Sequence, residues 1–341
     1  MSQLAYARSA LAAGRPVVVV DDLTVVDTPH AALMIAAQCV TTTNLAHLIA
    51  RTSGLVMVAV ADDRARRLGL PRMPRDLPTT TGPTQLVAVD ASSGVTTGIS
   101  ATDRAHTIRT LAAASAVPGS FTRPGHVIPV SSSPHGLIGH QGFADAATDL
   151  LSGTNLEAVA AYASLVSTTA PTELARPDEI ADYTTTQRIP VVSFTEILHS
   201  AVSTRPMISL ADEESDVASH GKLRRLTYAS PFERAHHTVL VPRDRAPATV
   251  QVLLECHHHD PFTHTDCCCT TEAAEAITRV RTSRDHALIY LRDSTGTGPA
   301  PQAVADAVRN AVLDHLRRDL ADRGDRSTIT AAPTGFLNVA Y

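Results

Sequence analysis

Two short apolar runs, at Pro16–Val20 and Leu55–Val60, lie in the first half of this chain. Uninterrupted apolar runs of that length, rich in β-branched residues, indicate strands that are buried on both faces of a sheet. Stretches with helical periodicity stand between and after them. Such alternation is typical of domains in which helices cover a sheet, so we expect an α/β or α+β fold.

The remaining elements follow from the same patterns. We expect helices at 2–13, 29–39, 43–51, 62–68, 102–113, 144–151, 177–187, 194–203, 272–279 and 302–322, and further strands at 85–89, 191–192, 238–241, 249–255 and 287–291. Acidic and small residues with weak periodicity fill 207–221, which has the composition of a linker. The sequence therefore predicts a domain at 1–206, a linker at 207–221 and a smaller domain at 222–341.

Composition excludes several classes of partner. The net charge is −5 and the pI about 6.3, so no overall attraction to nucleic acid or to an anionic membrane is expected. Aromatic residues make up 4% and tryptophan is absent, which argues against base-stacking surfaces. The segment Met1–Arg8 lacks the pattern of a signal peptide, and no stretch has the apolar length of a membrane span. We expect a cytoplasmic protein that binds neither nucleic acid nor membrane.

Four of the five cysteines fall in a short stretch from Cys256 to Cys269, which also holds four histidines. Thiolate and imidazole are the ligands that Zn²⁺ prefers, and they bind it tetrahedrally. Adjacent cysteines are poor partners for one another because disulfide geometry is specific. A disulfide cluster or inert buried thiols remain alternatives, but the pattern favours a zinc site.

Two polar motifs lie in the first half. At 94–108 a turn rich in glycine and hydroxyl groups enters a helix, where free backbone N–H groups favour an anion such as phosphate, and Arg104 could add a charge-assisted bond. A capped helix with an exposed Asp103–Arg104 pair explains this pattern equally well. At 123–129 prolines bracket His126, and a lone histidine is more often structural than catalytic.

Together the two motifs resemble 3,4-dihydroxy-2-butanone 4-phosphate synthase, which makes the four-carbon unit of riboflavin from ribulose 5-phosphate. The strings are Thr-Thr-Gly-Ile-Ser-Ala-x-Asp-Arg at 96–104 and Pro-Gly-His-Val-x-Pro at 124–129, and the resemblance runs from Ala10 to about Arg205. It implies a synthase-like fold, a sugar-phosphate ligand and a homodimer formed through this domain. It also implies a catalytic role for His126 and pocket positions for Thr97, Asp103 and Arg104.

The second half resembles a shortened GTP cyclohydrolase II, a domain often fused to the synthase. That family holds catalytic zinc through Cys-x10-Cys-x-Cys, and Cys256, Cys267 and Cys269 keep this spacing. The resemblance therefore implies that these thiols are the zinc ligands. Other positions depart from the family, because Glu272 replaces a Gln that reads guanine and 292–297 lacks the Glu and second Arg of a phosphate motif.

The first half also departs from its family at the metal site. The synthase binds Mg²⁺ through Arg-Glu-x-Glu-x-Asp after its Asp-Asp pair, whereas this chain has Leu23–His30 there. In the segment His140–Asp145, Phe143 replaces a metal-binding His and His140 replaces a phosphate-binding Arg, so His140 is a further pocket candidate. The family's later acid–base Glu falls at Ser164. Mg²⁺ demands oxygen ligands, so we do not expect it here.

These losses predict a pseudoenzyme or regulatory protein, acting as a homodimer or as a heteromer with an active paralogue. The first alternative is a divergent enzyme that acts on a sugar phosphate through His126, His140 and His30. The second alternative is retained synthase activity.

The zinc site itself is expected to be structural, with a fourth protein ligand in place of water. Binding would stabilise the second domain by about 10 kcal/mol. X-ray absorption spectroscopy of the zinc-loaded protein should then show four sulfur or nitrogen ligands and no oxygen. An oxygen neighbour would contradict the prediction, and an exposed histidine run that binds nothing is the competing interpretation. The candidates for the fourth ligand are His257, His258, His259, His264 and Cys268.

Overall fold

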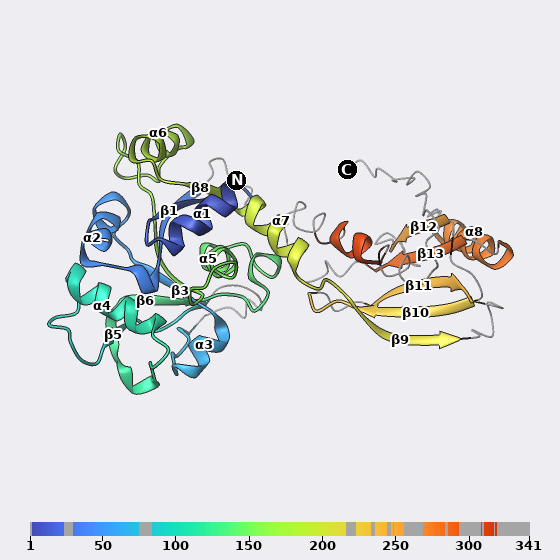
Figure 1. The fold of residues 1–341 in the computed structure, drawn as a ribbon, viewed down its shortest axis with the longest axis horizontal. Helices are drawn as coiled ribbons and strands as arrows, with labels where there is room; N and C mark the ends of the chain where they lie inside the picture. The colour runs from blue at the N-terminus through green and yellow to red at the C-terminus, as the bar shows by residue number, and fades with distance from the viewer. Residues whose placement is uncertain are drawn as a thin grey trace. The chain divides into compact units, whose positions relative to one another are not determined.

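The structure, a computed structural model, describes residues 2–23, 30–74, 84–215, 223–232, 236–243, 247, 249–255, 269–283, 286–292, 308, 310–316 and 318. The chain divides between Thr204 and Arg205 into two compact units, each with its own sheet (Figure 1). We call them the N-terminal unit and the C-terminal unit. The mixed α and β architecture confirms the predicted fold class.

A mixed sheet forms the middle of the N-terminal unit, in the order β4-β6-β3-β7-β2-β1-β8, with β5 paired to β6. β7 is antiparallel to both neighbours, whereas β6 runs parallel to β3 and β8 parallel to β1. The strands are β1 (Val17–Asp21), β2 (His30–Ala36), β3 (Met57–Val60), β4 (Thr84–Gln85), β5 (Val89–Ala91), β6 (Phe121–Ser131), β7 (Val159–Ser164) and β8 (Val191–Ser193).

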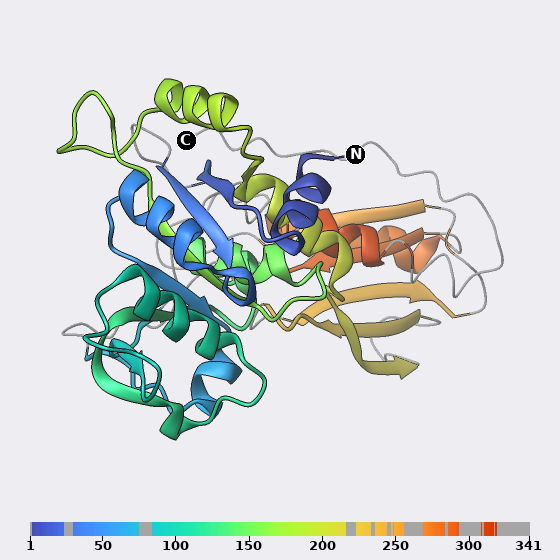
Figure 2. The ribbon, with the colours of Figure 1, turned by 60° about the vertical axis from the view of Figure 1, so that its left-hand side comes forward.

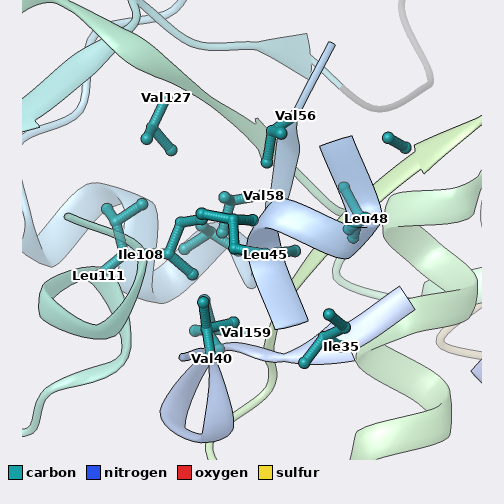
Figure 3. Close-up of a cluster of buried hydrophobic side chains, with 14 of the residues drawn as sticks. Ile35, Val40, Leu45, Leu48, Val56, Val58, Ile108, Leu111, Val127 and Val159 are labelled. Atoms are coloured by element: carbon teal, nitrogen blue, oxygen red, sulfur yellow. The ribbon is translucent and has the colours of Figure 1, made fainter. Parts of the chain in front are cut away.

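Helices cover both faces of this sheet. On one face, Ile35 and Val58 pack in a buried cluster with Leu45 of α2 and Ile108 of α4 (Figure 3). On the other face, α1, α5 and α7 contact the strands. The helices are α1 (Gln3–Ala12), α2 (Thr42–Arg51), α3 (Asp62–Arg67), α4 (Ala101–Ala112), α5 (Phe143–Leu151), α6 (Pro177–Gln187) and α7 (Phe194–Thr204), and the 3-10 turns are η1 (Ala37–Cys39), η2 (Pro118–Ser120) and η3 (Gly136–Ile138).

The helix expected at 29–39 is wrong, because most of this stretch is strand β2. Its sequence, His-Ala-Ala-Leu-Met-Ile-Ala, is rich in good helix formers. Six of its seven residues are buried, since β2 lies between β1 and β7 and has helices on both faces. Burial in the centre of a sheet therefore overrides the local propensity.

The C-terminal unit is built on a five-stranded sheet in the order β12-β13-β11-β10-β9 (Figure 2). Helix α8 (Cys269–Thr282) packs on one face, where Ala276 and Val280 join Leu223, Leu240 and Leu288 in a buried cluster. Of the helix expected at 302–322, residues 308, 310–316 and 318 are described and are helical. The strands are β9 (Ser209–Ser215), β10 (Leu223–Ala229), β11 (His236–Pro242), β12 (Thr249–Leu254) and β13 (His286–Leu291).

The linker expected at 207–221 is wrong for its first part, which forms strand β9. Its acidic residues face water on the edge of the sheet, and Glu213 and Glu214 pair with Arg224 and Arg225 of β10. Exposed charges on an edge strand oppose sheet-to-sheet aggregation. They also hide the alternation that would have indicated a strand.

Among residues with described structure, every helix is too short or too polar to cross a bilayer.

One carboxylate closes the loop between β7 and α6. Glu179 accepts hydrogen bonds from the main-chain N–H of Arg176, at 3.1 Å, and from Ser167, Thr168 and Thr169. The Arg176 bond, followed by those from Ser167 and Thr169, outweighs partial burial and lowers the pKa of Glu179 to about 2. The charged form is thus favoured in the folded protein.

The Glu179 carboxylate should therefore stabilise the fold at neutral pH and lose that effect in acid. Its ordinary pKa is 4.5, so the contribution is complete above about pH 4.5 and is lost as the pH falls toward about 2. Urea unfolding should show Glu179→Gln to be less stable than the parent near pH 7, with a difference that shrinks below pH 4.5. Asp178→Asn, at an exposed neighbouring position, is the matched control. A pH-independent difference would contradict this assignment.

Candidate functional site

A carboxylate–imidazole pair lies where β5 meets β6. Asp90 of β5 accepts the main-chain N–H of His126 through Oδ1 at 3.0 Å, and its Oδ2 lies 2.8 Å from His126 Nδ1. Asp90 is buried, whereas the His126 side chain is 40% exposed. A carboxylate only accepts, so Nδ1 carries the proton of the neutral ring and Nε2 is left as an acceptor.

The glycine-rich turn before α4 packs directly against this pair. Gly98 has a φ of +85°, and a Cβ built there would lie 2.1 Å from Asp90 Oδ2 and 2.6 Å from His126 Nδ1. Asp103 holds the turn in place, since it accepts Thr96 Oγ1 at 2.7 Å and the Gly98 N–H at 3.1 Å. The Thr96 hydroxyl is the main cause that lowers the pKa of Asp103, against a smaller opposing effect of desolvation.

Three pocket candidates from the sequence therefore have different surroundings. Asp103 is only 4% exposed and holds the turn, so it does not line an open pocket. Thr97 is exposed beside Gly98. Arg104 is half-buried and donates to the Gly54 carbonyl at 3.4 Å, and burial lowers its pKa. Asp90 was not among the residues expected from sequence, although an acidic residue directly after an expected strand and just before a glycine-rich turn was a usable signal.

Strand register brings His126 and Ser164 to the same end of the sheet. Ile128 of β6 and Tyr162 of β7 face Met57 of β3 from its two sides. His126 precedes Ile128 by two residues in a parallel neighbour, and Ser164 follows Tyr162 by two in an antiparallel one. Both positions therefore lie beyond Met57 in the same direction. Strands β6 and β7 lie on opposite sides of β3 and are thus roughly 10 Å apart.

His30 lies at this end as well. Ala32 of β2 faces Ser164 of β7, and His30 stands two residues before Ala32. In the pairing of β2 with β1, His30 lies opposite Asp21. The Asp21 carboxylate accepts the Leu23 N–H at 3.1 Å. The rest of the segment that replaces the family's acidic motif, 24–29, lies outside the described residues.

The start of α5 is aromatic where the family resemblance places a metal-binding imidazole. Phe143 packs edge-on against Phe194, with ring centroids 5.2 Å apart, and lies 6.2 Å from Tyr162. Burial raises the pKa of Tyr162, so its hydroxyl stays neutral. His140 places its Nδ1 2.8 Å from Asp145 Oδ2. The rings around Phe143 do not fit a Mg²⁺ ion, which needs oxygen ligands in near-octahedral geometry.

The predicted zinc ligands are not tested by the structure. Cys256 and Cys267 lie outside the described residues, and the side chains of Cys269 and Glu272 are not described either. Within the described residues, no group of three or more His, Cys, Asp or Glu is arranged to hold a metal ion. The zinc site therefore stays a prediction.

Comparisons with known proteins agree with this architecture. Residues 5–200 match the family described as 3,4-dihydroxy-2-butanone 4-phosphate synthase, and residues 211–328 match GTP cyclohydrolase II. The riboflavin biosynthesis protein RibBA of Salinispora arenicola is 30% identical over 295 residues, which cover 86% of this chain and 69% of that protein. RibBA of Mycolicibacterium gilvum is 31% identical over 296 residues, with 84% and 69% covered.

Two solved structures are similar in fold. RibBX from A. baumannii, described as a two-domain 3,4-dihydroxy-2-butanone 4-phosphate synthase, covers 98% of this chain and 95% of its own with a TM-score of 0.77 and 21% identity. A 3,4-dihydroxy-2-butanone 4-phosphate synthase solved with two magnesium ions has a TM-score of 0.54 and 29% identity, with 60% of this chain and 98% of that one covered.

Gly98→Ala should displace the Asp90–His126 pair and destabilise the N-terminal unit. The positive φ alone costs an alanine about 1–2 kcal/mol, and the missing space for a Cβ adds to this. Gly119→Ala is the matched control, because a Cβ there meets nothing within 4 Å. Urea unfolding of both variants checks the prediction. Equal unfolding free energies for the two variants would contradict it.

Proposed function

Because this chain belongs to the 3,4-dihydroxy-2-butanone 4-phosphate synthase family and carries a GTP cyclohydrolase II domain after it, we propose that it serves riboflavin biosynthesis without catalysing the synthase reaction. In this proposal it is a pseudoenzyme that binds a partner subunit, either a second copy or an active paralogue. It would act in the cytoplasm, with structural zinc in its C-terminal unit and without magnesium at Phe143.

The aromatic cluster at the start of α5 is the observation that carries this proposal. The family reaction needs a metal ion to stabilise an enediolate and positioned groups that move protons. Phe143 packs against Phe194 and Tyr162, and cannot supply a ligand. Ser164 occupies the position that the family gives to an acid–base Glu, and a hydroxyl is a poor base at neutral pH.

Two exposed apolar side chains near the His126 pair support a partner subunit. Leu55 is 52% exposed and Ile99 is 54% exposed. Arg104 of α4 donates a hydrogen bond to the Gly54 carbonyl. Leu55 follows Gly54 directly, and Ile99 lies just before the start of α4. Exposed apolar side chains beside a candidate site are available for contact with a partner.

The second candidate is a divergent enzyme that acts on a sugar phosphate through His126. One observation favours it, because Asp90 fixes Nδ1 and leaves Nε2 as an accessible acceptor. That arrangement suits a general base. Retained synthase activity is the third candidate, and the names of the RibBA relatives speak for it.

Activity of the purified full chain separates the three candidates. With ribulose 5-phosphate and Mg²⁺, we expect the rate of formate release to be at least about 10⁴-fold below that of a RibBA relative assayed in parallel. Each lost catalytic group forfeits about 10²–10⁴ in rate. We also expect no formate from GTP, and co-purification with a riboflavin enzyme. Turnover of a sugar phosphate that His126→Ala abolishes would favour the second candidate. Complementation of a riboflavin auxotroph would overturn the proposal.

A further inference from the structure

Strand β5 is bonded to a helix as well as to a strand. Within the described part of the chain, β6 is the strand that pairs with β5, and α4 contacts β5 too. The pairing with β6 shifts in register between Val89 and Asp90, so the ladder of hydrogen bonds is interrupted next to the residue that contacts His126. Main-chain groups at such an interruption need other partners, because an unpaired buried N–H or C=O is costly.

Two threonine hydroxyls supply these partners, one at each end of the peptide unit that follows Asp90. Thr107 of α4 accepts the Ala91 N–H through Oγ1 at 3.0 Å, and Thr122 of β6 donates to the Asp90 carbonyl at 3.4 Å. Thr107 is 0% exposed and Ala91 is 3% exposed, so water does not replace the first bond. The Thr107 hydroxyl donates its own proton to the Asp103 carbonyl at 3.1 Å, which leaves its oxygen to accept from Ala91.

The peptide unit between Asp90 and Ala91 sets the direction of the Asp90 side chain. A peptide is planar, so holding both its N–H and its C=O fixes the backbone torsion that follows the Cα of Asp90. With that torsion fixed, the carboxylate meets the main-chain N–H of His126 through Oδ1 and the ring Nδ1 through Oδ2. The Thr107 hydroxyl thus acts on the pair through the backbone.

We propose that Thr107 is a positioning residue for the Asp90–His126 pair. Its buried hydroxyl fixes the peptide after Asp90, and the carboxylate placed in this way selects the Nδ1–H tautomer of His126. The effect reaches the exposed side of the ring, because Nε2 of a neutral imidazole accepts a hydrogen bond only in that tautomer. The inference rests on the proposed function only where it treats the His126 surface as a binding site. Its test reads the ring without substrate or partner, so its failure and a failure of the proposed function are distinct results.

Nitrogen-15 NMR of the histidine rings in the full chain tests the proposal. At about pH 9, where an imidazole of ordinary pKa is neutral, the parent should show His126 as the Nδ1–H tautomer. Thr107→Val keeps the shape of the side chain but removes the hydroxyl, so His126 should become a mixture of both tautomers. Thr107→Ser keeps the hydroxyl and should give the signal of the parent. The ring signals of His126 are identified by their absence in His126→Gln.

Thr110→Val is the matched control, because Thr110 makes the same helix-internal bond as Thr107 and donates to the His106 carbonyl at 2.9 Å. It removes a hydroxyl from α4 and leaves the acceptor of the Ala91 N–H in place, so His126 should keep the tautomer of the parent. Amide exchange should show the lost bond directly, because Ala91 should exchange about tenfold faster in Thr107→Val and at the parent rate in Thr110→Val. Thr107→Ala also lacks the hydroxyl and takes the place of Thr107→Val if that variant does not fold.

Three outcomes would overturn the proposal. One is a parent protein in which His126 is not mainly the Nδ1–H tautomer. Another is a Thr107→Val protein whose Ala91 amide exchanges faster while His126 keeps the tautomer of the parent. The third is the same tautomer mixture in Thr107→Ser or Thr110→Val as in Thr107→Val, since the bond to Ala91 would then not be the cause.

Discussion

The pairing of β7 with β3 on one side and β2 on the other determines what the N-terminal unit can bring to its candidate site. Tyr162 faces Met57, and Ser164 faces Ala32, so the end of β7 is aligned with its two neighbours. A slip of one residue would turn every side chain to the opposite face of a sheet that is buried on both sides. The positions of His126 and His30 relative to Ser164 follow from this register.

Buried carboxylates organise the loops that the sheet leaves irregular. Asp103, Asp145 and Asp149 each accept a main-chain N–H from a loop or a 3-10 turn, and Asp90 accepts the N–H of His126 in the irregular strand β6. A buried charge is costly unless it is hydrogen-bonded, and an unpaired N–H is costly too. Each of these contacts offsets both costs at once, which explains why so many acidic side chains lie inside a domain of modest size.

Local sequence predicts the parts of the fold whose signals are local. Helices α1, α2, α4, α6 and α7 match expected ranges, and the valine run predicts β1. β6 and β7 lie outside every predicted strand, because Pro124, Gly125 and Pro129 argue against a central strand and half of β7 is alanine. The motif at 124–129 identified His126. Its partner Asp90 is 36 residues away, and only the strand pairing brings the two together.

Different elements build the two sides of the candidate site, so their chemistry is separable. The turn before α4 and strands β5 and β6 hold a polar pair, whereas the start of α5 is aromatic. Replacing both partners of a hydrogen bond by apolar side chains of the same shape is often nearly neutral or stabilising. A protein with no use for His126 would gain little by keeping Asp90 buried beneath it. The pair therefore favours a role in which this surface binds a ligand or a subunit, whatever the aromatic start of α5 does.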